Sequence, residues 1–230
     1  MKTFLREQSL SLIFFGLFVV SLSGQAIAGW HDYNNLESWH AQMAGERPEL
    51  LSLGRYLTSS SFAQAVTENW QSEYLQFTLF ILLTLWFVQK GSTESKQPGE
   101  EGGESDEAQM LGRYARPDSP RWAKAGGWRL WVYSNSLVLV MAAIWMWSWF
   151  AQSVSGWSEY NAERLEHEQA PLSWLGYLGS ADFWQTTLQN WQSEFLAVGS
   201  MAVLAIYLRQ RGSPESKPVG CPHHSTGSEG

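Results

Sequence analysis

Residues 69–75 read NWQSEYL and residues 190–196 read NWQSEFL, so one seven-residue stretch occurs twice, 121 positions apart. The agreement continues downstream at the same spacing, because GSTESK at residues 91–96 returns as GSPESK at residues 212–217. Self-similarity at a fixed spacing is the sequence signature of a duplicated structural unit. The repeat therefore predicts a chain built from two copies of one element of fold.

The N-terminal segment also has a counterpart inside the chain. The glycine, tryptophan, tyrosine and asparagine pattern of residues 25–34 returns at residues 152–161, which is 127 positions later. Taken alone, residues 1–28 resemble a secretory signal, with basic residues before an apolar run and a small-residue site after it. Because the counterpart at residues 135–152 is internal, we expect the first segment to be retained as a helix of the mature protein.

Four apolar runs bear on membrane insertion. The first and third approach the roughly 20 residues that span a 30 Å hydrocarbon layer. The second and fourth have about 15 residues and cover roughly 22 Å, so each must extend back through its NWQSE stretch to span. A soluble bundle also permits short apolar helices, but the polar residues are concentrated in the linker and tail, which favours a membrane. The runs lie at residues 10–28, 74–88, 130–151 and 195–208.

The sequence therefore predicts an all-α polytopic membrane protein of four transmembrane helices, formed by tandem duplication of a two-helix hairpin with helical outer loops. A Gly, Glu and Ser-rich linker and a polar tail have little to bury and are expected to be disordered. The expected parts are a first repeat at 1–97 with spans at about 8–28 and 69–89, a disordered to juxtamembrane linker at 98–128, a second repeat at 129–219 with spans at about 131–151 and 190–208, and a tail at 220–230.

Basic residues predict the orientation. Of the 15 Lys and Arg residues, only Arg47, Arg55 and Arg164 fall on the side of the outer loops. Basic residues close to helix ends favour the cytoplasmic side. We therefore expect a multi-pass protein of the cell (inner) membrane with both termini and the linker in the cytoplasm. Because each repeat holds an even number of spans, both copies have the same orientation.

The outer loops, residues 29–68 and 153–189, are acidic and contain apolar residues at helical spacing, as interfacial helices do. They are the expected contact surface for a protein partner, besides the lipid bilayer itself, and a homo-oligomer is left open. The basic, tryptophan-bearing residues 113–129 are read either as a stop signal for insertion or as a contact for anionic lipid headgroups. The net charge of −7 is spread over the solvent segments, and no nucleic-acid partner is expected.

Matched polar residues near the outer ends of the spans form the candidate site, a polar vestibule. A carboxylate inside the membrane boundary is costly and usually faces the bundle interior. Two such carboxylates could share a proton, bind a cation or line a vestibule. The structural alternative is that the glutamates snorkel and the amides join helices. The candidate residues, paired four positions apart, are Ser21 with Gln25, Ser148 with Gln152, Asn69 with Glu73, and Asn190 with Glu194.

Ligands for a cofactor are scarce. No expected span contains a histidine, which argues against haem. Cys221, His223 and His224 could take zinc or copper but have no matching ligands elsewhere. The single cysteine excludes an intramolecular disulfide. No GxSxG, HExxH, phosphate-loop or dinucleotide motif is present, so we expect no catalytic residue, no metal, no cofactor and no enzyme activity.

Residues 190–196 and residues 209–219, which read RQRGSPESKPV, resemble a family of bacterial four-helix membrane proteins classified as a domain of unknown function. The resemblance covers both repeats and implies a bacterial inner-membrane protein without an assigned substrate. Thr93 differs from the family-like Pro214, so the first copy matches its terminal motif less well.

Two functions follow from these observations. The first is a non-enzymatic bundle whose polar outer vestibule passes or senses a proton or small cation. The alternative is a structural or stress-related membrane protein whose acidic outer loops bind a partner.

Overall fold

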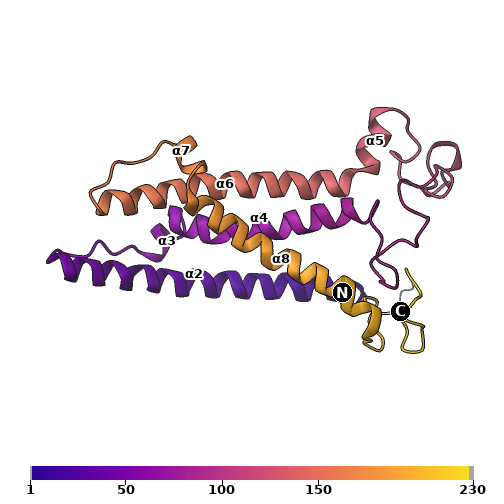
Figure 1. Cartoon of the computed structure of the whole chain (residues 1–230), viewed down its shortest axis with the longest axis horizontal. Coiled ribbons are helices and arrows are strands. Elements are labelled where there is room, and N and C mark those ends of the chain that lie inside the picture. Colours follow the sequence, from indigo (N-terminus) through magenta and orange to yellow (C-terminus); the bar gives the residue numbers. More distant parts are fainter. Residues whose placement is uncertain (1, 228–230) are drawn as a thin grey trace. The chain divides into compact units, whose positions relative to one another are not determined.

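The computed structural model describes residues 2–227, and within them it contains α-helices, one 3₁₀ helix and turns but no strand. The chain divides into two compact units. Unit 1 comprises Met1–Val66 and Val154–Pro171, and unit 2 comprises Thr67–Ser153 and Leu172–Gly230. The all-α prediction is confirmed. Figure 1 labels the helices, and the two units are described separately below.

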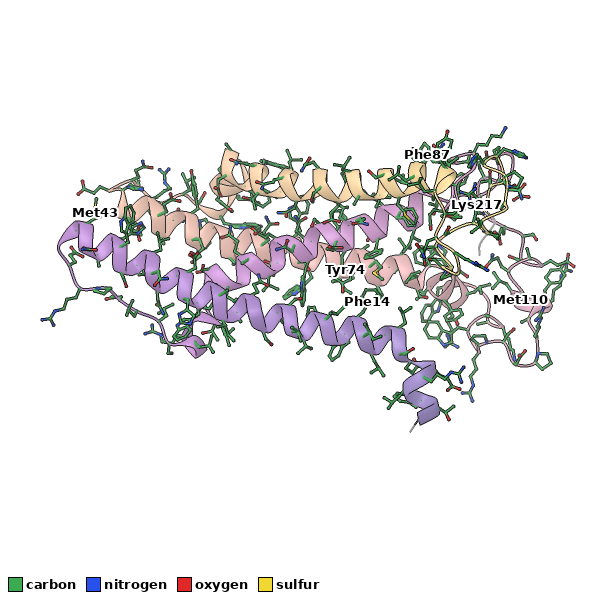
Figure 2. The ribbon with its side chains drawn as sticks, turned by 90° about the horizontal axis from the view of Figure 1, so that it is seen from below. Phe14, Met43, Tyr74, Phe87, Met110 and Lys217 are labelled. Atoms are coloured by element: carbon green, nitrogen blue, oxygen red, sulfur yellow. The ribbon has the colours of Figure 1, made fainter. Side chains whose placement is uncertain are left out.

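Unit 1 contains α1 (Lys2–Glu7), α2 (Ser9–Ala44) and α3 (Leu53–Tyr56), together with the start of α4 and the end of α6. α2 runs without interruption for 36 residues through the first expected span and into the outer loop. It ends at Gly45, whose φ of 73° is left-handed and whose backbone closes the last turn. Apolar side chains such as Phe14 project from the first half of α2 without cover (Figure 2).

The outer loop of unit 1 is held by the backbone of Leu51. Asn34 donates from Nδ2 to the Leu51 carbonyl at 2.9 Å and accepts the Leu51 N–H at 2.8 Å. Trp30 Nε1 donates to the same carbonyl at 2.6 Å. Tyr56 is buried nearby, and a side chain at Gly29 would collide with the Tyr56 hydroxyl. Glycine therefore allows the close approach of Tyr56 to α2, and a larger residue would displace the Tyr56 ring.

Unit 2 contains the rest of α4 and α6, with the shorter elements between and beside them. Ser173 accepts the Gly176 N–H at the start of α7, and Ser180 accepts the Phe183 N–H at the start of α8. Serine at these N-cap positions satisfies a helix donor that has no partner within the helix. The elements are α4 (Ser60–Leu83), η1 (Gly112–Tyr114), α5 (Trp128–Ser134), α6 (Ser136–Glu166), α7 (Trp174–Leu178) and α8 (Ala181–Tyr207).

The segments that precede the two NWQSE stretches have the same local structure. Ser52 caps α3 as Ser173 caps α7. A buried tyrosine follows in each, and its ring contacts a phenylalanine six positions later. The two ring pairs are Tyr56 with Phe62 at 5.5 Å and Tyr177 with Phe183 at 5.6 Å.

GSTESK and GSPESK also form one kind of turn. In each, the first serine accepts the N–H of the glutamate and the second accepts the N–H of a glutamine six residues before it. Lys96 donates to the Gly102 carbonyl and Lys217 to the His223 carbonyl, both at 2.9 Å and both six residues on. The Lys217 side chain, labelled in Figure 2, is 1% exposed. Its ammonium group also donates to the Gly91 carbonyl. Burial lowers the pKa of this ammonium group.

By length and composition, α2 and α6 are able to cross a membrane, which favours membrane association. The second expected span is shorter than predicted, because α4 ends at Leu83 and turns follow it. Polar residues in the NWQSE stretches of α4 and α8 lower the hydropathy of these helices. The disorder expected for residues 98–128 and 220–230 stays a prediction, and residues 228–230 lie outside the described residues.

Replacing Asn34 with alanine should lower the free energy of unfolding by about 1–3 kcal/mol, because it removes two hydrogen bonds to Leu51 and leaves the Leu51 N–H without its acceptor. Thermal unfolding of detergent-solubilised protein measures the effect. Asn35→Ala, at the exposed neighbouring position, is the matched control. Equal unfolding temperatures for the two variants would contradict the role given to Asn34.

Candidate functional site

Unit 2 buries a row of uncharged polar side chains on three helices. On α4, Gln71 is 0% exposed and shares a helix face with buried Thr78. On α6, Ser148 and Gln152 are each 1% exposed, and on α8 Thr187 is 0% exposed. Buried polar groups in proteins are nearly always hydrogen-bonded. A buried polar atom without a hydrogen-bond partner in the protein therefore marks a place where water or a ligand could bind.

A direct hydrogen bond joins the two NWQSE stretches. Trp191 donates from Nε1 to the Gln71 side-chain carbonyl at 2.7 Å. The Gln71 Nε2 group is buried and has no hydrogen-bond partner among the described residues. One end of the amide therefore joins α4 to α8, and the other end is a buried donor still available to a small ligand or water.

Trp149 of α6 lies at the centre of the same region. Its Nε1 donates to Thr187 Oγ1 at 3.4 Å, and its ring is 5.6 Å from that of Trp191. Trp145 stacks on it at 5.9 Å. Within the described chain, Trp145 Nε1 and Ser148 Oγ are buried without a hydrogen-bond partner. We call Gln71, Trp145, Ser148, Trp149, Thr187 and Trp191 the polar-aromatic cluster.

The carboxylates predicted for the vestibule closely follow cluster residues in the chain, Glu73 two residues after Gln71 and Glu194 three residues after Trp191. Glu194 is half-buried, one helical turn after Trp191, and the Glu73 carboxylate lies close enough to repel it. Glu73 itself is exposed, since two residues turn the helix by about 200° away from Gln71. The matched carboxylates are thus neighbours, while the hydrogen bond between the stretches uses tryptophan and glutamine.

The other predicted residues are distributed as follows. Ser148 is in the polar-aromatic cluster, and Gln152 is buried one turn further along α6. Asn190 donates to the Thr186 carbonyl of its own helix at 2.9 Å, and Asn69 is exposed on α4. Ser21 and Gln25 belong to unit 1 and are exposed, with Gln25 Nε2 3.4 Å from the Ala65 carbonyl.

A cavity of about 240 Å³ continues the α4–α8 interface beyond Glu73 and Glu194. Gln76, Phe77 and Phe80 line it from α4. From α8 it is lined by the residues 121 positions later in the chain, namely Ala197, Val198 and Met201. Glu94 and Glu215, the glutamates of GSTESK and GSPESK, close it. The α4–α8 interface therefore has a matched glutamate pair at each end.

Sequence reasoning missed Gln71, Thr187, Trp149 and the pair Glu94 and Glu215. The repeat itself contained the signal for the last pair, because both GSxESK motifs place a glutamate at the same position. For Gln71 no such signal exists, since the equivalent Gln192 is exposed. Local sequence does not distinguish the two glutamines.

A metal centre finds no support in the part of the chain that the structure describes, where no group of three candidate ligands assembles. The His223 ring contacts the Ile206 carbonyl through Nδ1 at 3.0 Å, and Arg209 donates to the Cys221 carbonyl at 3.0 Å. The tail thus folds back onto the end of α8.

A third acidic pair, Glu68 and Asp182, lies on the same two helices. Glu68 lies just before the second expected span and is half-buried. Burial raises the pKa of its carboxyl above 4.5, and the nearby Asp182 raises it further. Asp182 in turn accepts a hydrogen bond from the Tyr177 hydroxyl at 3.2 Å.

The features above define a class: an all-helical protein with two helices able to cross a membrane and a buried polar-aromatic cluster between α4, α6 and α8. The chain belongs to the family described as Domain of unknown function (DUF6766), whose model matches residues 1–228. Membership in a domain-of-unknown-function family was expected and is confirmed. Neither a curated protein nor a solved structure shows significant similarity to the chain.

Gln71→Leu should lower the free energy of unfolding by about 1–3 kcal/mol, because it leaves the half-buried Trp191 indole N–H without its acceptor. Gln192→Leu, in the same motif but exposed, should stay within about 0.5 kcal/mol of wild type. Chemical unfolding followed by tryptophan fluorescence measures both. If the two leucine variants lost equal stability, the asymmetry between the stretches would be refuted.

Glu68→Gln should make the stability of the protein less dependent on pH. The raised pKa lets the folded protein keep the Glu68 proton where the unfolded chain has lost it, so the free energy of unfolding falls as pH rises above 4.5. The glutamine side chain does not ionise, so the variant does not lose stability in this way as pH rises. It should unfold at a higher temperature than wild type near pH 7 and at the same temperature below 4.5.

The matched control is Glu163→Gln, at an exposed position of α6. Thermal scans of all three proteins across this pH range measure the effect. A constant difference between Glu68→Gln and wild type at every pH would show that the carboxyl does not titrate in this way.

Proposed function

We propose that the protein is a four-span protein of a bacterial inner membrane, with cytoplasmic termini, that passes or senses protons or a small cation along the α4–α8 interface. The matched glutamate pairs at the two ends of that interface carry the proposal. Glu73 and Glu194 are neighbours at one end, and Glu94 and Glu215 line the cavity at the other. The activity is non-enzymatic, and the matched positions descend from an internal duplication.

The polar-aromatic cluster supports hydration of this interface. Gln71 Nε2, Trp145 Nε1 and Ser148 Oγ are buried hydrogen-bonding atoms without partners among the described residues. An unsatisfied polar group is costly in a low-dielectric interior. Bound water, which makes two to four hydrogen bonds to such groups, removes the cost. Water beside a half-buried carboxylate provides a route for protons.

The architecture supports the membrane part of the proposal. α2 and α6 are apolar around their whole circumference at their inner halves, as lipid-facing helices are. α4 and α8 are less apolar because they contain the polar NWQSE stretches, and part of this polar content, including Gln71 and Thr187, is buried in the protein. The equivalent caps and tyrosine–phenylalanine pairs of the two segments support a duplicated hairpin.

The test is flux in proteoliposomes that contain a pH-sensitive dye or a cation indicator. Glu194→Gln removes one charge at the first pair and should lower flux several-fold. Combining Glu94→Gln with Glu215→Gln removes the second pair and should do the same. Because both pairs act on one path, the triple variant should be non-additive. Glu100→Gln, in the exposed linker, is the control and should behave as wild type.

Flux no greater than in protein-free liposomes would overturn the transport form of the proposal. Sensing is then tested by whether pH changes tryptophan emission in wild type but not in Glu194→Gln. An unchanged response in that variant would overturn the sensing form as well.

A second candidate function is partner binding through the outer loops. Trp39 and Met43 lie beyond the first expected span on α2, and both side chains are largely exposed. Apolar residues next to acidic ones on such a loop are typical of a protein contact. Cross-linking from Met43→Cys would trap a partner, or a second copy of the chain, if this function holds.

A further inference from the structure

Unit 2 has a second, larger cavity of about 410 Å³ between α6, α7 and α8. This volume is within the range of small-molecule sites. Trp149 and Phe150 line it from α6, Trp174 from α7, and Phe183 and Trp184 from α8. We call it the aromatic cavity.

The rings face the cavity at different angles. Trp149 is within 19° of parallel to Phe183, at 6.2 Å, but 72° from Trp184, at 6.3 Å. Phe150 and Trp174 are 75° apart at 6.1 Å. Walls inclined to one another at both small and large angles form a cage rather than a slot for one flat ring.

The indole N–H groups of the cage are already used within the protein. Trp149 donates to Thr187, Trp174 to Ser153 Oγ at 3.2 Å, and Trp184 to the Leu178 carbonyl at 3.0 Å. The walls therefore offer ring faces instead of hydrogen bonds. A neutral polar ligand would lose its hydrogen bonds to water on entry, which is unfavourable.

Ring faces attract cations, and cages of this kind recognise quaternary ammonium groups, which donate no hydrogen bond. The charges around the cavity have the matching sign. Asp182 precedes the cage residue Phe183 and accepts a hydrogen bond from Tyr177, whose ring contacts Phe183 at 5.6 Å. The segments that line the cavity, residues 136–153 of α6 together with α7 and α8, contain no lysine or arginine. A cation in the cage would be attracted by the ring faces and by Asp182, and no lysine or arginine on these segments would repel it.

The cage is present in only one of the two repeated segments. The positions 121 residues before Trp174 and Trp184 hold Leu53 and Ala63, and the position 127 residues before Trp149 holds Leu22. The repeated tyrosine, phenylalanine and capping serines maintain the local fold without these tryptophans. The tryptophans are thus additional to what the fold of the segment needs.

We propose that the aromatic cavity binds an organic cation carrying a quaternary ammonium group, either a free amphiphilic cation or a lipid headgroup. The proposal rests on the cavity walls and does not require ion passage along the α4–α8 interface.

The test uses the full chain in nanodiscs of phosphatidylethanolamine and phosphatidylglycerol, which lack choline. Benzyltrimethylammonium is titrated against neopentylbenzene, its neutral isostere with carbon in place of nitrogen, and tryptophan fluorescence reports binding. The cation should bind at least tenfold more tightly than the neutral compound. Trp184→Ala should weaken cation binding at least tenfold, whereas Trp184→Phe, which keeps an aromatic face, should retain most of it.

Trp131→Ala removes an exposed tryptophan outside the cavity and should bind as wild type does. Equal affinity for the cation and its neutral isostere would overturn the proposal and leave an unspecific apolar cavity. Undiminished cation binding by a folded Trp184→Ala protein would overturn it as well. Adding phosphatidylcholine to the nanodiscs identifies the source: competition assigns the site to a lipid headgroup, and unchanged affinity assigns it to a free cation.

Discussion

The hydrogen bond from the Trp191 indole to the Gln71 amide is the contact on which unit 2 depends. Burying a glutamine on a largely apolar helix is costly unless hydrogen bonds offset the loss of water around its amide. Trp191 satisfies the oxygen and, through its ring, brings Trp149 of α6 into the same region. One polar contact thereby links three helices and fixes which face of α4 is directed to the interior.

This contact also explains the uneven hydropathy of the four long helices. α2 and α6 are apolar enough to cross a membrane by composition alone. α4 and α8 are shorter and contain more polar residues, of which Gln71 and Thr187 are buried. Part of the polar content of these helices therefore faces other protein atoms. Polar residues inside a bundle are costly and tend to be functional.

Repetition of sequence does not produce repetition of environment. The turns of GSTESK and GSPESK, the capping serines and the tyrosine–phenylalanine pairs recur with nearly equal distances. In the NWQSE stretches, by contrast, the first copy buries its glutamine and serine, and the second turns its tryptophan and glutamate inward. The α4–α8 interface is asymmetric because the hydrogen bond between the helices takes its acceptor, Gln71, from the first stretch and its donor, Trp191, from the second. That asymmetry frees the remaining members of each stretch for contact with lipid, water or ligand.

The sequence by itself determined the all-α class, the family and the positions of the repeated motifs. These features depend on residues close together in the chain, where capping, helical spacing and side-chain-to-backbone hydrogen bonds act over six residues or fewer. Only the tertiary structure decided that Gln71 is buried and Gln192 exposed, and that five aromatic rings enclose one cavity. The Trp191–Gln71 contact joins residues 120 positions apart, and the wall of the aromatic cavity comes from three helices. Helical periodicity identifies the faces of a helix but not the element that each face contacts. The contacts between helices are therefore known only from the tertiary structure.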